Sequence, residues 1–427
     1  MTLACNVSFR ALDDTVNSTT DGLYGLTKYP AKFIPQVVNY AFDKSPLLQS
    51  ANANRHDGWS VTDPFAGVGT VAISAHLRHI QSEIWDINPM MQHYQKAHAT
   101  VLASSETPLH IATNIKTQLK TVRLVRHAAS QFMSNLDYLC QWYHPEVFAM
   151  LTHLWSIYPK CTDAEQALLL IPLLRITNKW SYNDLQRQKL CHSKRKHDQI
   201  DSWLTKDNWK QHLLEDLSNQ VDDAAFRYMT HKTTAPWEFN PDIHIVSPNP
   251  DAVVVQGHGD VVVTSPPYLQ AQEYIRASKL SLLWLGHSLD EIRSRNRLEI
   301  PYGSPKRDQV VASPMFAHVH KFYERNEDSR ALRVLESYFS NTLDVLERAT
   351  VNAKETYLFV GAAGLHGTSI PLDVIFAEHF VYKLGWTHSV TLHDKIVAKT
   401  LFKSETNPAT GRVDQRMSTE QLVVLVR

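Results

Sequence analysis

A short segment suited to activating an amino group follows an apolar run in the second half of the chain. Val261-Val262-Val263 leads into Thr264-Ser265-Pro266-Pro267-Tyr268. Proline fixes its backbone φ and has no N–H, so the Pro266 carbonyl is held in one direction beside the Ser265 hydroxyl. Two such acceptors would bind the N–H bonds of an exocyclic amine and act most strongly as positive charge develops on its nitrogen. Tyr268 adds a ring face for stacking, so the predicted catalytic set is Ser265, Pro266, Pro267 and Tyr268.

A glycine-containing turn, Asp63-Pro64-Phe65-Ala66-Gly67-Val68-Gly69-Thr70, lies earlier in the chain. Gly67 and Gly69 lack a Cβ, which allows a tight turn and a close approach to a ligand. Thr70 opens the following helix, whose free N–H groups would meet a carboxylate. Asp86 closes the next expected strand and is placed to accept both hydroxyls of a ribose. Asp63 would hold the turn or bind an ammonium group. Together with the amino-group corner, this unit suits S-adenosylmethionine as cofactor.

Each of these strings also has a purely structural interpretation. A Gly-x-Gly string can be a plain tight turn, and a Pro-Pro-Tyr string can be a turn after a strand, with Tyr268 capping a core. The segment Lys28 to Pro35 has two interpretations. It could form a lid over the methionine end of the cofactor, or it could simply be the proline-bounded start of a helix. Asp251 would lie near the cofactor adenine or form a turn. The predicted cofactor-binding set is Tyr29, Lys32, Phe33, Asp63, Pro64, Phe65, Gly67, Gly69, Thr70, Asp86, Asp251 and Thr264.

Taken together, these strings resemble the amino-group DNA methyltransferases, most closely the Ser-Pro-Pro-Tyr type that methylates cytosine N4. The matching segments are spread over most of the chain outside residues 101–240. They are Lys28 to Pro35, Asp63 to Thr70, Asp86, Thr264 to Tyr268, Gln272 to Arg276, Leu282 to Gly286 and Arg416 to Glu420. One feature departs from many cytosine-N4 enzymes: the cofactor turn precedes the catalytic corner, with residues 101–240 between them.

The resemblance implies direct methyl transfer from S-adenosylmethionine to cytosine N4 in a specific sequence of double-stranded DNA. The target base must leave the helix stack to be reached. No Pro-Cys nucleophile accompanies the motifs, so no covalent intermediate is expected. Serine is commonest at the first motif position for cytosine N4, whereas Asp or Asn is commoner for adenine N6 and RNA guanine N2. DNA adenine-N6 and RNA guanine-N2 methyltransferases, and a catalytically silent DNA-binding module, are the alternatives.

Basic residues gather in two segments. The first runs from Arg175 to His197, where Trp180 and Tyr182 are interleaved with the charges, which suits phosphate contacts and base stacking or simply a solvated helix face. The second, from Arg293 to Arg297 and on to Lys306 and Arg307, lies close in sequence to the catalytic corner and would support base flipping. The predicted DNA contacts are Arg175, Lys179, Trp180, Lys194, Arg195, Lys196, Arg276, Arg293, Arg295 and Arg297.

The elements that must position these residues read as an α/β fold. Strands are expected at 59–62, 83–86, 243–246, 253–255, 260–264, 355–360, 387–392 and 421–426, and helices at 34–42, 71–79, 145–158, 164–177, 331–349 and 372–384. Pro172 is expected to kink or break its helix, and 288–328 reads as loop-rich. The resemblance implies a Rossmann-like methyltransferase fold, a mostly parallel sheet with an antiparallel C-terminal hairpin at its edge. Residues 1–100 and 241–427 would form the catalytic domain and 101–240 a helical, target-recognising insertion.

Composition bears on which partners, metals and cellular compartment we expect for this protein. The chain has 427 residues and a formal net charge of zero, so any DNA-binding surface must come from the distribution of charge. Cys5, Cys140, Cys161 and Cys191 form no Cys-x-x-Cys pair, and the histidines are dispersed, so we expect no metal site and no disulfide framework. No signal peptide or membrane span is visible, which favours the cytoplasm. The resemblance implies a bacterial or phage origin. The family implies a restriction–modification or orphan role, the former with a cognate restriction endonuclease as partner.

Overall fold

The computed structural model describes residues 4–12, 16, 18–27, 33–49, 60–120, 134–184, 190–244, 255–269, 274–300, 303–306, 308–395 and 419–427. Its centre is an eight-stranded sheet in the order β1-β9-β10-β6-β5-β2-β3-β4. Every neighbouring pair is parallel except those that β10 makes with β6 and β9. The predicted mixed α/β fold with a mostly parallel sheet is therefore confirmed. The strands are β1 (Ala4–Val7), β2 (Ser60–Asp63), β3 (Gln81–Trp85), β4 (Asp242–His244), β5 (Val261–Thr264), β6 (Glu355–Gly361), β9 (Thr387–Lys395) and β10 (Thr419–Val426).

Helices cover both faces of this sheet. Side chains alternate along a strand, so Val261 and Val263 of β5 point to one face while Val262 points to the other. The first face packs against α1 (Phe9–Leu12), α2 (Pro35–Lys44), α3 (Pro46–Gln49) and α4 (Thr70–Leu77). The second packs against α15 (Pro314–Arg325), α16 (Ser329–Ala349) and α17 (Leu372–Leu384), with the small hairpin β7 (Ala363–Leu365) and β8 (Thr368–Ile370) beside them.

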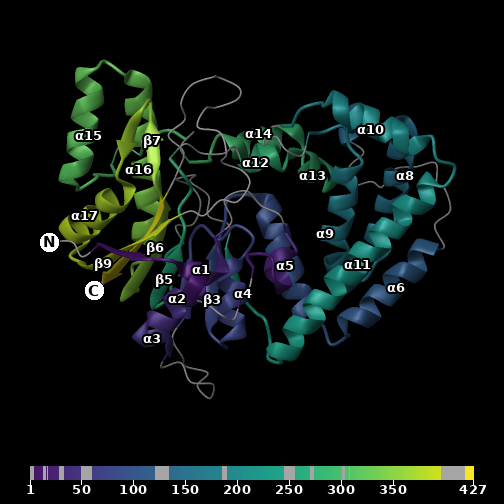
Figure 1. The fold of residues 1–427 in the computed structure, drawn as a ribbon, viewed down its shortest axis with the longest axis horizontal. Coiled ribbons are helices and arrows are strands. Elements are labelled where there is room, and N and C mark those ends of the chain that lie inside the picture. Colours follow the sequence, from purple (N-terminus) through teal and green to yellow (C-terminus); the bar gives the residue numbers. More distant parts are fainter. Residues whose placement is uncertain are drawn as a thin grey trace.

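All regular elements described between β3 and β4 are helical, and they lie on the opposite side of Figure 1 from α15 and α17. They are α5 (Pro89–Ala103), α6 (Pro108–Lys120), α7 (Leu136–Leu139), η3 (Cys140–Trp142), α8 (Pro145–Trp155), η4 (Tyr158–Lys160), α9 (Asp163–Lys179), α10 (Lys194–Leu204) and α11 (Trp209–Thr234). We call the stretch from α6 to α11 the helical region. Its central helix, α9, packs against α5, α6 and α11.

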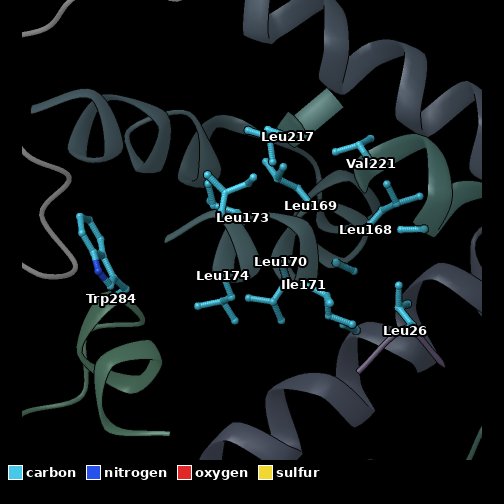
Figure 2. Close-up of a cluster of buried hydrophobic side chains, with 14 of the residues drawn as sticks. Leu26, Leu168, Leu169, Leu170, Ile171, Leu173, Leu174, Leu217, Val221 and Trp284 are labelled. Atoms are coloured by element: carbon cyan, nitrogen blue, oxygen red, sulfur yellow. The ribbon is translucent and has the colours of Figure 1, made fainter. Parts of the chain in front are cut away.

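The leucine-rich α9 supplies much of the core of this region. Figure 2 shows Leu168 to Leu174 among Leu217 and Val221 of α11, Leu26 after η1 (Gly22–Gly25), and Trp284. Trp284 belongs to α13 (Lys279–Trp284), stacks on Trp155 with ring centroids 5.5 Å apart, and donates to the Tyr143 hydroxyl at 2.8 Å. The helical region and the chain that follows the catalytic corner therefore share one continuous core.

Four details differ from the expectations. α9 runs unbroken through Pro172, because its packed neighbours and a Thr162–Glu165 capping box stabilise the helix. The segment 288–328 is not loop-rich, since it contains α14 (Leu289–Asn296) and α15; α12 (Tyr274–Ala277) and α13 precede it. The antiparallel strand β10 is not at the sheet edge, because it lies between β6 and β9. The edge beyond β9 is formed by β1, which the sequence did not indicate.

Candidate active site

A cavity lies where three parallel strands end. The carboxyl ends of β2, β3 and β5 meet at one edge of the sheet, so Pro64, Asp86 and Ser265 leave their strands side by side. The cavity encloses about 1170 Å³ of empty space that is continuous with solvent. Its lining includes many of the predicted site residues: Phe33, Pro64, Phe65, Gly67, Thr70, Asp86, Ser265, Pro266, Pro267 and Tyr268.

The glycine turn and the acid after β3 are held together by backbone donors. The Asp86 carboxylate accepts from Gly67 N at 2.7 Å through Oδ2 and from Asn88 N at 2.8 Å through Oδ1. Gly67 takes a φ of 51°, a region that favours glycine. Each carboxylate oxygen can accept a second hydrogen bond, so Asp86 can still bind a pair of neighbouring hydroxyls. Burial raises the pKa of Asp86 to about 7, against the lowering effect of these two hydrogen bonds.

Two glutamines of α5 complete the turn and were not predicted. Gln95 Nε2 donates to the Gly67 carbonyl and Gln92 Nε2 donates to the Asp86 carbonyl, both at 2.7 Å. Residues three apart on a helix lie on one face, so a single face of α5 supports both sides of the turn. The polar pair Gln92 and Gln95 in the helix after the acid was the available sequence signal.

Asp63 has the first of its two expected roles, which is to hold the turn. Its side chain is buried, and Oδ1 accepts from Thr264 Oγ1 at 2.6 Å and from Phe65 N at 3.1 Å. These bonds join the end of β2 to the end of β5 and therefore fix the cofactor turn relative to the catalytic corner. Burial raises the pKa of Asp63 to about 7, although both hydrogen bonds act in the opposite direction. Asp63 and Thr264 do not line the cavity.

Gly69 has the backbone conformation that the predicted tight turn requires. It precedes α4 with a φ of 85°, and a Cβ built there would meet its nearest neighbour, Gln95 Cγ, at 3.7 Å. The left-handed backbone of the turn favours glycine at this position. Thr70 begins α4 and does line the cavity, so the first turn of the helix faces the site.

The catalytic corner is only partly exposed. Pro266 is buried, while Ser265, Pro267 and Tyr268 are half-buried at the cavity wall. Tyr268 donates its hydroxyl to Glu420 Oε1 of β10 at 3.2 Å. Burial and the neighbouring Glu420 raise the pKa of the Tyr268 phenol, so it stays neutral near pH 7. The Ser265 hydroxyl makes no hydrogen bond to the described part of the chain.

The opposite wall of the cavity comes from segments that sequence analysis did not assign to the site. Leu298, Glu299 and Ile300 follow α14, and Asn341 and Asp344 belong to α16. Lys306 and Arg348 both pair with the Asp344 carboxylate, at 2.5 and 3.0 Å. The sequence signals for this wall were the basic segment that contains Lys306 and the polar residues among the apolar positions of helix 331–349.

Three of the predicted DNA contacts in the helical region have structural roles. Trp180 is buried beside Trp203 and Trp209, so its ring cannot stack on a base. Lys196 is buried and donates to the Lys179 carbonyl at 2.6 Å. Arg175 donates to the carbonyls of Gly25 and Leu26, at 3.2 and 2.5 Å, and so ties α9 to the chain after η1. We therefore remove these three residues from the candidate DNA contacts.

The other predicted cations are accessible. Lys194 and Arg195 lie exposed on α10, and the Lys179 side chain is half-exposed and paired with Asp216. Nearer the cavity, Arg276, Arg293 and Arg297 are exposed and Arg295 is half-buried. Arg297 directly precedes the wall residue Leu298. Tyr29, Lys32 and Asp251, and most of the predicted lid, lie outside the described residues.

The chain is similar to one curated protein, "Type II methyltransferase M.MvaI" from Kocuria varians. The two are 22% identical over 434 residues, which cover 93% of this chain and 89% of that protein. No family model and no solved structure matches the chain significantly. Among the described residues, no helix is both long and apolar enough to cross a membrane.

Proposed function

We propose that this chain is an S-adenosylmethionine-dependent DNA methyltransferase that modifies the N4 amino group of cytosine in a specific duplex sequence. The observation that carries the proposal is one cavity lined by both the Gly67–Asp86 turn and the Ser265–Tyr268 corner. A nucleoside site and an amino-activating corner are therefore within reach of a single bound cofactor and base. The similarity to a Type II methyltransferase supports methyl transfer as the reaction class.

The residues of the turn fit the cofactor. The Asp86 carboxylate is held by two backbone N–H groups and keeps lone pairs for the ribose hydroxyls. The start of α4 at Thr70 offers free backbone N–H groups for the carboxylate of the methionine part. Phe65, Val68 and Ile87 supply apolar surface for the adenine. When bound, S-adenosylmethionine supplies an electrophilic methyl group on its sulfonium.

The corner then positions the amino group. The Ser265 hydroxyl and the Pro266 carbonyl would each accept one N–H of cytosine N4, which directs the nitrogen lone pair toward the cofactor. Because no described residue occupies the Ser265 hydroxyl, it is available for this contact. Tyr268 would stack on the extruded ring, and its bond to Glu420 holds the ring in place.

DNA would approach the side of the molecule that carries the arginines of α12 and α14. Figure 1 places both helices at the same end of the molecule as α10, between the helical region and α16. Arg276, Arg293, Arg295 and Arg297 would contact phosphates around the extruded base. Residues 101–240 remain our candidate for target recognition, now through Lys179, Lys194 and Arg195. A restriction–modification or orphan role, and a partner endonuclease in the former, follow as part of the proposal.

Nucleoside mass spectrometry tests the proposal directly. DNA from cells that express the chain should contain N4-methylcytosine, and DNA from cells that express Ser265→Ala should contain at least roughly a hundredfold less. N6-methyladenine in its place would retain the mechanism and overturn the base. Unmodified DNA together with methylated RNA would overturn the DNA assignment, and no modification of either would overturn the activity.

A further inference from the structure

One face of α16 forms a polar wall that the proposed function does not yet use. Asn341, Asp344, Val345 and Arg348 are spaced by one helical turn or less and all line the cavity. Asp344 pairs through Oδ2 with the cations Lys306 and Arg348. Asn341 is the neutral polar residue of this wall.

The chemistry of its neighbours fixes the orientation of the Asn341 amide. Nδ2 donates to the Ser337 carbonyl at 2.8 Å and to the Ser304 carbonyl at 3.1 Å. Both partners are carbonyl oxygens, which only accept, so the atom facing them must be the amide nitrogen. Oδ1 therefore faces away from them. It accepts no hydrogen bond from the described part of the chain.

The same contacts make this side chain rigid. Segment 303–306 is fastened to α16 by Ser337 Oγ, which donates to the Gly303 carbonyl at 2.5 Å, and by Lys306 N, which donates to Ser340 Oγ at 3.1 Å. Asn341 donates to Ser304, which lies between Gly303 and Lys306 in this segment, and is 8% exposed. An amide that is packed and bonded on one side has little freedom to turn its oxygen away from a ligand.

We infer that Asn341 Oδ1 accepts a hydrogen bond from the exocyclic amino group of a nucleobase in this cavity and is thus a specificity-determining residue. An acceptor in a half-enclosed site favours an amino group and disfavours an oxo group, which would place two lone pairs in contact. Two bases of the proposed reaction carry such a group, the adenine of the cofactor and the target base. The inference rests on the proposed function, and its test has one arm for each source.

The cofactor arm uses isothermal titration calorimetry with S-adenosylhomocysteine and its 6-oxo counterpart, S-inosylhomocysteine. If the cofactor adenine is the ligand, the protein binds the amino compound roughly ten to a hundred times more tightly, and Asn341→Leu removes that preference. Asn326→Leu is the matched control, because it makes the same substitution at an exposed position outside the cavity. The control should retain the preference.

The target arm uses duplexes that contain the site mapped by the methylation experiment, with cytosine or the amino-free 2-pyrimidinone at the target position. If the target base is the ligand, Asn341→Leu removes the protein's preference for cytosine in fluorescence anisotropy and leaves the cofactor preference unchanged. Equal preferences in the protein and Asn341→Leu, in both arms, would overturn the inference. If Asn341→Leu does not fold, the unsubstituted protein alone still tests the inference. The inference is overturned if this protein prefers neither the amino form of the cofactor analogue nor cytosine at the target position. Failure to bind S-adenosylhomocysteine at all would instead count against the proposed function.

Discussion

Two hollows in this molecule are built in opposite ways. The cavity at the strand ends is lined by residues that directly follow β2, β3 and β5, and backbone N–H groups hold its central acid. The second hollow, of about 800 Å³, lies in the helical region where α9, α10 and α11 come together. Trp180, Trp203 and Trp209 form its wall, with ring centroids 4.7 and 6.0 Å from Trp180.

We propose the first hollow as the reactive site, and we interpret the second as structural. In the first hollow, the Ser265 hydroxyl makes no hydrogen bond to any residue that the structure describes. Beside the second, Lys179 bonds Asp216, and Lys179 and Lys196 lie over the Trp203 ring. Basic and aromatic residues that looked like a DNA-binding surface in sequence satisfy one another here. Substitutions in the two hollows should therefore affect different properties.

The largest effect is expected from Trp180→Ala. A buried tryptophan truncated to alanine lowers the free energy of unfolding by about 3–5 kcal/mol. Urea denaturation would measure this loss, while DNA affinity of the folded variant should stay within a factor of two or so of the original. Phe226→Ala, at an exposed position on α11, is the control. A large loss of DNA affinity with unchanged stability would show that Trp180 contributes to DNA binding and not to folding.

Ser265→Ala should show the reverse pattern. Loss of one positioned acceptor lowers methyl transfer by roughly a hundredfold or more. Stability and the affinity for S-adenosylhomocysteine should be unchanged, because no described residue bonds this hydroxyl. Incorporation of radioactive methyl groups into DNA measures the rate, with Ser329→Ala, at an exposed position on α16, as control. Normal turnover would remove the role assigned to Ser265.

Asp86→Asn should weaken cofactor binding by roughly ten to a hundredfold. An amide in this place directs an N–H toward the backbone N–H of Gly67 or Asn88, which leaves a donor unsatisfied. Calorimetry with S-adenosylhomocysteine measures the change, and the exposed Asp290→Asn is the control. Unchanged affinity would show that Asp86 supports the turn without contacting the ligand.

Cofactor affinity should also depend on pH. Burial raises the pKa of Asp63 and Asp86 to about 7, so both acids are largely protonated at pH 6. Binding to an ionised Asp86 should therefore strengthen by up to about tenfold per pH unit below 7 and level off above it. The stability of the free protein changes in the opposite sense. A carboxyl group whose pKa is higher in the folded protein than in the unfolded chain stabilises the folded state. This stabilisation is complete below the pKa of the unfolded chain and is lost as the pH rises through 7.

Calorimetry across pH 5.5–8.5 checks both trends, since the same samples give thermal unfolding temperatures. Asp86→Asn should flatten the affinity profile. An affinity that is constant over this range in the original protein would contradict the assignment of Asp86 as the ionised ligand.

The smallest effect is expected at the exposed arginines outside the cavity. Arg297→Ala should weaken DNA binding severalfold and reduce the slope of log affinity against log salt by about one. Anisotropy titrations at several salt concentrations separate this phosphate contact from a packing defect. Arg195→Ala on α10 tests in the same way whether the helical region also touches DNA.

Sequence order made the first hollow predictable and the second not. The strand, turn, helix and acid around Gly67 and Asp86 follow one another in the chain, and a parallel sheet brings their ends together with Ser265. Asn341 lines the cavity, and Gln95 and Glu420 support lining residues, only through packing and strand pairing. The sequence contains the pair Gln92 and Gln95 and the segment Arg416 to Glu420, but it does not show which residues they contact. The burial of Trp180 was equally hidden, because its neighbours Trp203 and Trp209 come from other helices.

The position of β10 has a consequence for biosynthesis. This strand occupies residues 419–426, yet it lies inside the sheet between β6 and β9. A ribosome-bound chain that has not yet exposed these residues has two unjoined parts of a sheet. Its Tyr268 also lacks the Glu420 carboxylate that supports it. A chain that stops before residue 419 therefore carries the glycine turn but lacks both β10 and the Glu420 support of the proposed catalytic corner.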